Sequence, residues 1–514
     1  MRSHDYRRFG SLLSALYLEL LGGGVYAFSV YSGKLHQLGL RQEEVQLIAT
    51  SGNLGAWLLL PAGYFFDRYG PSVGILLGCV LTGLGYALLY LVFTARMTAS
   101  LPLLCVGAFM AQHGGGYWDG SAVPMATKNF APDKGLVLGL LKGFFGISAS
   151  VITVLYQSYF RPNISSFILV LSVGLPAGAL ATILGADLTK GQILALTLEE
   201  RTRVAVLGYG LLAVLVVYIS CSSIYQREAS YAILGSFLWV LIAGFGALYL
   251  PLRVPAEIGR RLGLNFNKSP AAEGDGDEEG ERQDATLLPP SDPPEAGRQS
   301  RYGSVLRQRE FWHVFVICSV VMGSGITLIN NVHDLVVSLA MDGESGTAGD
   351  TYVVLISVGS CMGRAGVGLL SDSYSSVWSR PTFVLANCLL MMSAQLTLCI
   401  ANLNALYVSC IVCGMAFGAM FTLLPCTLAD LYGHEDFGKI LGTAMFAPML
   451  GSILFSTFLA SILYNSHIPD GEPHNICKGG KCFQSTFFIL SICCLCAAFL
   501  AFRLKRSTDD RARK

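Results

Sequence analysis

Long apolar stretches alternate with short polar segments along most of the chain. Each stretch runs for about 20 residues with few charged side chains, which is the length of α-helix that crosses the hydrocarbon core of a bilayer. The stretches lie at residues 9–33, 43–66, 72–94, 101–125, 134–157, 165–187, 204–226, 229–251, 311–335, 350–370, 382–401, 404–428, 438–462 and 484–503. The pattern therefore predicts an all-α polytopic membrane protein with about 14 spans.

The spans fall into three groups. Six lie within residues 1–190, two within residues 204–251 and six within residues 310–503, and a basic tail follows at residues 504–514. Residues 252–309 differ in kind because they contain an acidic run and two proline pairs. Such a composition cannot bury enough apolar surface to offset the entropy of ordering, so we predict a disordered linker there. The predicted arrangement is two six-helix bundles with two additional helices between them.

The lysines and arginines outside the spans lie mostly on one side of the predicted topology. The N-terminal tail, the linker and the C-terminal tail carry many of them, whereas the segments on the opposite side carry few. Basic segments stay on the cytosolic side of a membrane. We therefore predict cytosolic termini and a cytosolic linker, and we favour the plasma membrane, with a vacuolar or lysosomal membrane as the alternative.

The composition agrees with a protein embedded in lipid. Hydrophobic residues make up 53% of the 514 residues and charged residues only 13%, whereas a soluble domain carries about 25% charged residues. The chain shows no Walker motif, metalloenzyme pattern or nucleophile with a paired base, so we expect neither an enzyme nor a cofactor. The expected partners are the lipid bilayer, a small-molecule or ion solute and protons, and no nucleic acid.

A few ionisable residues fall inside the predicted spans of the first half, where charge is costly and marks a functional site by default. Glu19 lies near the middle of the first span without an evident partner, and we expect it to carry a proton. Asp119 and Lys142 lie at similar depths in spans four and five. They form either a structural ion pair or, through Lys142, an anchor for the solute. We expect His113 to be a hydrogen-bonded core histidine, and Tyr117 in the same glycine-rich segment is a further candidate solute contact.

Span four also carries three consecutive glycines, Gly114 to Gly116. Glycine is unfavourable in the middle of a helix, but it lets helix backbones approach closely within a membrane. We therefore expect a tightly packed neighbour, with Gly143 and Gly146 in span five as the matching surface.

Polar residues in the spans of the second half have more than one interpretation. Asn330 and Asn331 lie toward the outer end of their span and form either an outer gate or an interfacial helix end. Arg364 lies near the cytoplasmic face, where it either snorkels to the surface or pairs with Asp430.

Most of the 15 cysteines lie in apolar stretches, where cysteine behaves as a small hydrophobic residue. Cys477 and Cys482 instead flank a polar Lys-Gly-Gly-Lys loop. We expect a disulfide between them if the loop faces an oxidising compartment. A metal site is the weaker alternative.

One short motif occurs at the same place in both halves. Gly63 to Asp67 ends the second span, and Gly368 to Asp372 ends the second span of the second half. The recurrence indicates two homologous halves, and charged groups at a seam suit contacts that form in one conformation and break in another. The residues assigned to this conformational switch are Asp67, Arg68, Arg364, Asp372 and Asp430.

These motifs resemble the major facilitator superfamily, whose loop between helices two and three carries Gly-x-x-x-Asp-Arg-x-Gly. Asp67 and Arg68 match this signature, and Asp372 matches a weaker second copy. More narrowly, the chain resembles the nodulin-like branch, which includes monocarboxylate-transporter-like proteins of fungi. The resembling segments are Tyr26–Ser32, Asn129–Gly135, Gly139–Ser148, Leu424–Gly433, Phe437–Gly438 and Pro448–Ser452. Tyr26 is thereby a further candidate solute contact.

The resemblance implies a transporter that works by alternating access, with the solute held between the bundles. Organic acids and iron are both proposed substrates of this branch. Our first hypothesis is a proton-linked carrier of a small organic anion, with Glu19 taking the proton and with Lys142 and His113 near the solute. The second is a carrier of a transition metal such as iron that uses Glu19, His113 and Asp119. The third is a non-transporting receptor or scaffold that signals through the linker.

Overall fold

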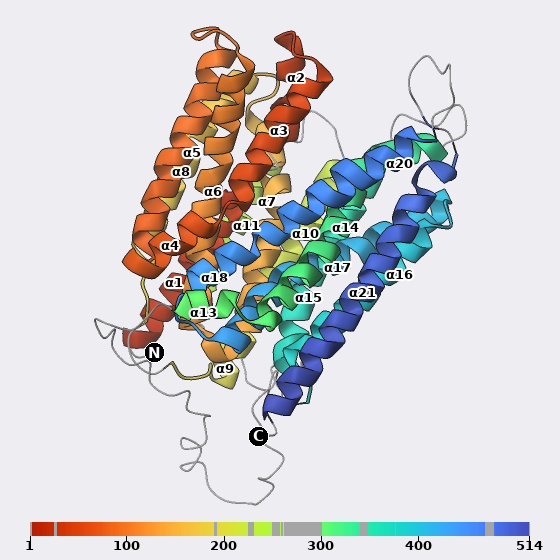
Figure 1. The fold of residues 1–514 in the computed structure, drawn as a ribbon. Helices are drawn as coiled ribbons and strands as arrows, with labels where there is room; N and C mark the ends of the chain where they lie inside the picture. The colour runs from red at the N-terminus through yellow and green to blue at the C-terminus, as the bar shows by residue number, and fades with distance from the viewer. Residues whose placement is uncertain are drawn as a thin grey trace, which may run out of the picture.

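The computed structural model describes residues 3–24, 28–189, 193–224, 231–248, 301–339, 348–375, 377–467 and 479–512, together with residues 258, 261 and 477. These residues form helices and connecting turns, without a strand, arranged as two bundles side by side (Figure 1). Ten of the described helices are long and apolar enough to cross a membrane. The all-α polytopic fold predicted from the hydropathy pattern is confirmed.

Two of the spans in the first half are broken into shorter helices. The helices are α1 (Ser3–Gly22), α2 (Phe28–Gln37), α3 (Gln42–Trp57), α4 (Leu60–Tyr69), α5 (Pro71–Phe93), α6 (Leu101–Asn129), α7 (Lys134–Tyr159) and α8 (Ile164–Thr182), with a 3₁₀ turn η2 (Ala131–Asp133) before α7. The break between α3 and α4 precedes Pro61, which stands in the first turn of α4. Proline is tolerated there because its missing N–H has no partner in a first turn. α1 ends at Gly22, one turn beyond Glu19.

Two additional segments follow the first bundle. The first consists of α9 (Leu198–Arg203), the π-helical η3 (Val204–Tyr209) and α10 (Gly210–Ile224), and the second consists of α11 (Tyr231–Gly244) and the 3₁₀ turn η5 (Phe245–Leu248). α10 and α11 pack against α7, and η5 also contacts α1. The hydroxyl of Tyr209 donates to the carbonyl oxygen of Leu136 at 2.6 Å. The hydroxyl of Tyr17 donates to the backbone carbonyl oxygen of Ile242 at 3.0 Å. The added pair therefore covers one flank of the first bundle.

The second half repeats the six spans of the first. Its helices are α13 (Arg301–Leu306), α14 (Arg309–Leu339), α15 (Ala348–Ser373), α16 (Arg380–Leu398), α17 (Leu403–Tyr432), α18 (Phe437–Ala444), α19 (Phe446–Gly451), the π-helical η6 (Ser452–Ala460), α20 (Ser461–Asn465) and α21 (Lys481–Ala512). The end of the predicted linker is helical, because α13 lies within it and contacts α18. Most of the linker lies outside the described residues.

The two halves meet most closely at the end that carries the chain termini. There α4 packs against α18, and α7 packs against α15. Two glycine pairs allow the backbones to touch: Gly63 faces Gly438, and Gly135 faces Gly368. A methyl group at any of these positions would overlap atoms of the opposite helix. Away from this end the halves diverge, and α2 and α20 stand well apart (Figure 1).

Glycines also pack α6 against three helices of its own bundle. Gly114 approaches α5, Gly115 approaches α1 and Gly116 approaches α3. The matching surface predicted on span five is therefore wrong. Gly143 packs against α10 and Gly146 against α15, because the face of α7 that carries them points toward the added helices and the second half.

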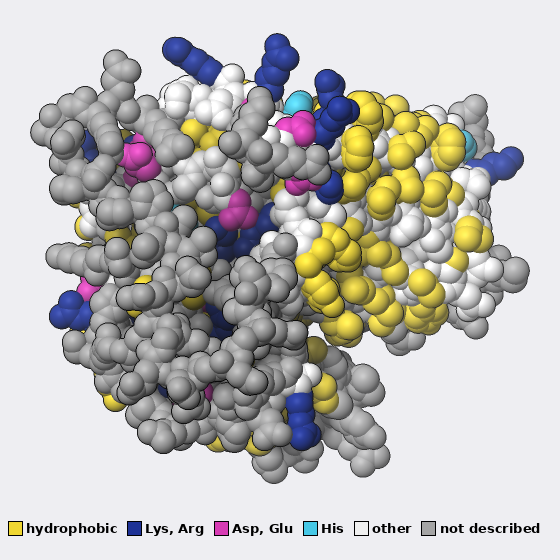
Figure 2. All heavy atoms as spheres, turned by 90° about the horizontal axis from the view of Figure 1, so that it is seen from below, with side chains coloured by type: hydrophobic (Ala, Val, Ile, Leu, Met, Phe, Trp, Pro, Cys, Tyr) yellow, Lys and Arg dark blue, Asp and Glu magenta, His cyan; other side chains and the backbone are white. Residues whose placement is uncertain are grey.

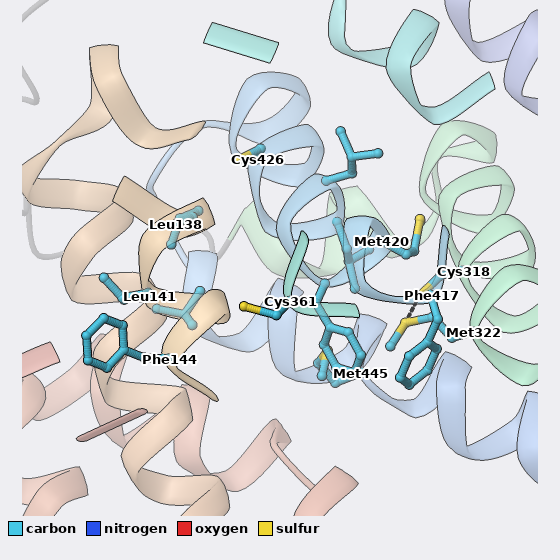
Figure 3. Packing of buried hydrophobic residues seen from close by; sticks show 14 of the residues in the cluster. Leu138, Leu141, Phe144, Cys318, Met322, Cys361, Phe417, Met420, Cys426 and Met445 are labelled. Carbon is cyan, nitrogen blue, oxygen red and sulfur yellow. Dashed lines mark hydrogen bonds between the residues drawn. The ribbon is translucent and has the colours of Figure 1, made fainter. Parts of the chain in front are cut away.

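An apolar layer runs through the seam between the halves. In Figure 3, Leu138, Leu141 and Phe144 of α7 lie on one side of Cys361, and Met420 of α17 lies on the other. All five side chains are buried. The halves thus share one continuous core at the seam.

The face that carries the termini combines charged and apolar regions. Figure 2 shows acidic and basic side chains around the middle of the described part of this face, and hydrophobic side chains over one flank. An apolar flank suits contact with lipid acyl chains.

Candidate solute and coupling site

Three ionisable side chains from three helices of the first half meet inside the membrane-spanning region. Nζ of Lys142 (α7) lies 3.2 and 3.3 Å from the two carboxylate oxygens of Glu19 (α1). The same ammonium also donates to the carboxylate of Asp119 (α6). The side chain of Glu19 is 0% exposed, that of Lys142 5% and that of Asp119 13%. We name these three residues the carboxylate–lysine cluster.

The cluster corrects one expectation and supports another. The sequence offered no partner for Glu19, but Lys142 is its partner. Asp119 and Lys142 do form an ion pair, as one of the two predicted alternatives required. Close packing of α1 against α6, where Gly115 approaches the Gly22 carbonyl oxygen, brings Glu19 to this depth.

Arg364 of α15 reaches the cluster from the second half. Its Nη1 donates to the carbonyl oxygen of Lys142 at 3.0 Å, and the residue is 1% exposed. In the described part of the chain its guanidinium forms no ion pair with a carboxylate, and its buried Nε has no hydrogen-bond partner. A buried cation without a counter-ion is costly. Arg364 is therefore the most unusual charge at the seam.

The prediction that Arg364 snorkels to the cytoplasmic face or pairs with Asp430 is wrong, because Arg364 is buried against α7. Asp430, at the end of α17, instead binds Arg380 at 2.5 Å and also pairs with Lys134. Its partners begin α16 and α7, at the same end of the molecule, whereas Arg364 lies more than two turns before the end of α15.

Two aromatic rings lie beside the guanidinium of Arg364. The ring of Phe145 lies near both cations, with its centroid 5.2 Å from Nζ of Lys142 and 5.6 Å from Cζ of Arg364. Phe421 of α17 lies 4.3 Å from the same Cζ, and Trp57 at the end of α3 stacks on Phe421 with a centroid distance of 5.9 Å. Arginine is favourable over aromatic faces. These rings also supply an apolar wall beside the charged groups.

His113 and Tyr117 are not part of the cluster. Nδ1 of His113 lies 3.0 Å from the carbonyl oxygen of Gly55 in α3. The ring of Tyr117 packs edge-on against His113 and near Phe65. His113 is thus the hydrogen-bonded core histidine that the sequence favoured.

The remaining candidate solute residues are placed elsewhere or are not described. The amide of Asn330 donates to Ser456 of η6 at 2.9 Å, and that of Asn331 to the Thr327 carbonyl oxygen of its own helix at 2.8 Å. Both amides are therefore engaged within the second half. Tyr26 lies outside the described residues.

Two aspartates of the repeated motif join the halves at the termini side. Asp67 accepts backbone N–H groups of Gly438 at 3.1 Å and Lys439 at 2.9 Å. Asp372 accepts the N–H of Leu136 at 2.7 Å. We call these the first and second capping contacts. Each contact joins the end of the second span of one half to the beginning of a helix in the other half. Such contacts between halves are expected of a conformational switch.

Arg68 and the cysteine pair complete the predicted set. Nη1 of Arg68 donates to the hydroxyl of Tyr64 at 2.9 Å on the surface of its own helix. Cys477 and Cys482 are joined by a disulfide.

Family comparisons match both halves of this architecture. The model of the nodulin-like family matches residues 8–256, and that of the major facilitator superfamily matches residues 343–514. The chain belongs to the nodulin-like branch of the major facilitator superfamily. The resemblance noted in the sequence is confirmed, and with it the paired-bundle fold.

Relatives of this nodulin-like protein include a probable transporter, MCH1, of Yarrowia lipolytica. It is 24% identical over 494 residues, which cover 92% of this chain and 88% of the relative. The protein NUCLEAR FUSION DEFECTIVE 4 of Arabidopsis thaliana is 23% identical over 172 residues, or 33% of this chain and 29% of the relative.

Solved structures of major facilitator transporters share the fold of this nodulin-like protein. The Escherichia coli fucose:proton symporter FucP superposes with a TM-score of 0.54 at 12% identity, over 96% of this chain and 98% of that one. The proton:xylose symporter XylE superposes with a TM-score of 0.53 at 14% identity, over 97% and 96% of the two chains. At this identity the likeness concerns the fold alone.

Sequence reasoning missed three basic residues of this nodulin-like protein. Lys128 lies 3.6 Å from Asp67, Arg380 lies 2.7 Å from Asp372, and Lys134 pairs with Asp430. A signal was present, because Lys134 and Arg380 each begin a helix directly after a short loop at the termini side. The positive-inside pattern predicts only the side of the membrane on which such residues lie, not their partners.

Proposed function

We propose that the protein is a proton-coupled carrier of a small organic monoanion, which binds beside Arg364 and crosses the membrane with one proton. The observation that carries this proposal is Arg364, a buried cation without a carboxylate partner in the described part of the chain. Burial of an unpaired charge is unfavourable. A carboxylate from solution would supply the direct ion-pair partner that Arg364 lacks, and guanidinium groups bind carboxylates in a two-pronged geometry.

Charge balance links the anion to a proton. Glu19 and Asp119 carry two negative charges, and Lys142 and Arg364 carry two positive ones, so the four groups are neutral when all are ionised. A bound monoanion adds one uncompensated negative charge in a site of low polarity. Protonation of Glu19 or Asp119 restores neutrality. Solute and proton are therefore expected to travel together without net movement of charge.

The geometry also supports communication between solute and proton. Arg364 donates to the backbone of Lys142, whose side chain holds both carboxylates. A solute on Arg364 would lie within reach of the ammonium when one carboxylate is protonated and releases it. Because Arg364 belongs to the second half and the cluster to the first, the solute would bind at the seam that alternating access opens.

The metal-carrier hypothesis receives no support. Glu19 and Asp119 both face the ammonium of Lys142, which repels cations, and His113 bonds to Gly55 instead. Among the described residues, no three His, Cys, Asp or Glu side chains form a group that could hold a metal ion. The receptor hypothesis concerns a linker that lies mostly outside the described residues.

The membrane and the orientation also remain proposals. We place the termini and the capping contacts in the cytosol because basic residues concentrate on that side. In that orientation the structure is closed toward the cytosol and diverges toward the outside (Figure 1). We propose the plasma membrane as its location.

Flux measurements in liposomes test this function. Labelled acetate, lactate and pyruvate would be offered to the purified full chain under an inward proton gradient, with the membrane potential set separately by potassium and valinomycin. We expect uptake of at least one acid that follows the proton gradient and does not change with the potential. Uptake driven by the membrane potential would contradict electroneutral transport of solute and proton. Flux of only Fe(II) or only a neutral sugar, independent of the proton gradient, would contradict an anionic solute.

Two variants assign the roles of the charged groups. Loss of a charge-assisted hydrogen bond costs about 1.5–3 kcal/mol, so Arg364→Gln should weaken anion binding about 10- to 100-fold. Glu19→Gln should abolish accumulation by the proton gradient but leave exchange of labelled for unlabelled acid. Arg503→Gln, at an exposed position of α21, is the matched control and should retain wild-type flux. If Glu19→Gln keeps wild-type coupling to the proton gradient, Asp119 rather than Glu19 carries the proton.

A further inference from the structure

A groove of about 910 Å³ opens on the outer surface of the first bundle, away from the carboxylate–lysine cluster. Its floor is formed by α1 and α7, and its walls by α8 and α11. Apolar residues supply most of its lining, including Leu13, Leu21 and Leu155, and Gly174 and Gly178 make room along α8. A cavity of this size suits a ligand rather than a few waters.

The added helices create this groove. The hydroxyl of Tyr17 ties α1 to the Ile242 carbonyl oxygen of α11, and Trp239 of the same helix stands at the rim with 53% of its surface exposed. Without α11 the groove would have one wall fewer. At the termini side the floor closes tightly, because Gly185 approaches the Gly10 carbonyl oxygen.

The groove is longer than the hydrocarbon thickness of one leaflet, which leaves room for a headgroup at one end. Along α1 the lining runs from Tyr6 to Leu21, which is about 22 Å at a rise of about 1.5 Å per residue. Half of the hydrocarbon core is about 15 Å thick. An acyl chain can therefore lie along the apolar part while its headgroup stays at the termini side.

The charged end of the groove carries one group of each sign. Arg7 and Asp187 both line it, with 3.9 Å between Nη1 and Oδ2, and their side chains are 75% and 57% exposed. An anionic headgroup would meet repulsion from Asp187. A zwitterionic headgroup fits both, with its phosphate at Arg7 and its ammonium at Asp187.

We propose that this groove binds a zwitterionic, amine-bearing glycerophospholipid of the phosphatidylethanolamine type. One acyl chain lies along α1 between α8 and α11, the phosphate contacts Arg7 and the ammonium contacts Asp187. The bound lipid supports the outer side of α1, the helix that carries Glu19 on its buried face. The added helix pair thus gives the bundle a lipid site.

Native mass spectrometry of the full chain tests the site. Delipidated protein would be titrated with phosphatidylethanolamine, phosphatidylcholine and phosphatidylglycerol, and retained lipid counted. Gly174→Trp should reduce retention of phosphatidylethanolamine at least fivefold, because a side chain there has room and fills the groove. Val173→Trp is the matched control, since Val173 is 62% exposed on the same helix but does not line the groove. We expect it to retain lipid as the wild type does.

A second groove-filling variant and a variant without the two charges test the location and the headgroup separately. Ala181→Trp fills the same groove and replaces Gly174→Trp if that variant does not fold. Removal of both charges, Arg7→Ala together with Asp187→Ala, should remove the preference for phosphatidylethanolamine over phosphatidylglycerol. Equal lipid loss in Gly174→Trp and Val173→Trp, or unchanged retention in both groove variants, would show that the lipid does not bind in this groove. Preferential binding of phosphatidylglycerol by the wild type would contradict a zwitterionic headgroup.

Discussion

Asp67 and Asp372 stand at equivalent places in the two halves and bind the opposite half in the same way. The first accepts N–H groups at the start of α18, and the second accepts one at the start of α7. α18 and α7 each begin the fifth span of their half. The first N–H groups of a helix lack partners and form the positive end of its dipole, which favours a carboxylate there. A repeat in the sequence thus becomes a symmetric pair of contacts.

The charges around the two aspartates differ. Asp372 has a side chain that is 3% exposed and lies 2.7 Å from Arg380, whose guanidinium also binds Asp430 at 2.5 Å. Asp67 faces Lys128 at 3.6 Å, and the lysine side chain is 24% exposed. The capping geometry is shared, so the strength of each contact is set by its neighbours rather than by the motif.

Asp372→Asn should shift the equilibrium most strongly toward an open termini side. The amide keeps the shape of the carboxylate but removes the negative charge that Arg380 faces. Removal of one partner of a buried ion pair costs about 3–5 kcal/mol, and because Asp430 still faces Arg380 we expect about 2–3 kcal/mol here. Spin labels at Tyr69 and Val377, which are exposed on opposite halves, should then show a longer distance in most molecules.

Asp67→Asn should produce a smaller shift with the same label pair, about 1–2 kcal/mol. The amide oxygen can still accept one backbone N–H, and Lys128 can turn toward water. Asp334→Asn is the control, because its carboxylate is 61% exposed on the second half. A shift from Asp67→Asn equal to or larger than that from Asp372→Asn would contradict the ranking of the two contacts.

The spans could be predicted because apolar length is a direct consequence of bilayer thickness. Their breaks could not. Leu58 and Leu59 are as apolar as their neighbours, so hydropathy stays high where α3 ends and α4 begins, and only Pro61 hints at the change. The break at Met445, between α18 and α19, is likewise marked only by a proline, Pro448 in the first turn of α19, because the residues around it are apolar.

Part of the site could be predicted from depth alone. Asp119 and Lys142 lie at similar distances from the same membrane face, and that is enough to suggest a pair. The contact of Glu19 with Lys142 requires α1 to pack against both α6 and α7, which no local pattern states. The partner of Arg364 could not be predicted for a related reason. The close crossing of α15 and α7 at Gly368 brings Arg364 against α7, and no local sequence pattern indicates that crossing.

His434, in the turn between α17 and α18, should make the equilibrium between the closed and open arrangements depend on pH. Burial, with Lys134 and Lys128 nearby, lowers the pKa of His434 from 6.5 to about 4, while Asp430 acts in the opposite direction. If the termini side opens and water reaches the ring, its pKa returns toward the ordinary value. The open arrangement then binds more protons. The closed arrangement is therefore favoured fully above about pH 6.5 and loses this advantage as pH falls toward about 4.

The same label pair measures this effect. Between pH 7 and pH 5.5 we expect a several-fold rise in the open population, on the order of 1 kcal/mol. His434→Gln should remove most of that rise while leaving the distance at pH 7.5 unchanged. An identical pH profile in His434→Gln would assign the dependence to another group, with the two capping aspartates as the next to test.

Arg68→Ala should have the smallest effect on the closed arrangement, although Arg68 belongs to the motif. Its guanidinium bonds to Tyr64 and lies 5.4 Å from the ring centroid of Tyr69, both on α4. The second copy of the motif has Ser373 in its place. Surface substitutions without partners across a seam change stability by about 0.5 kcal/mol or less. We expect an unchanged label distance, together with slower flux if Arg68 makes its contacts in the open arrangement. A lengthened distance as large as that of Asp67→Asn would instead place Arg68 among the groups that hold the first capping contact closed.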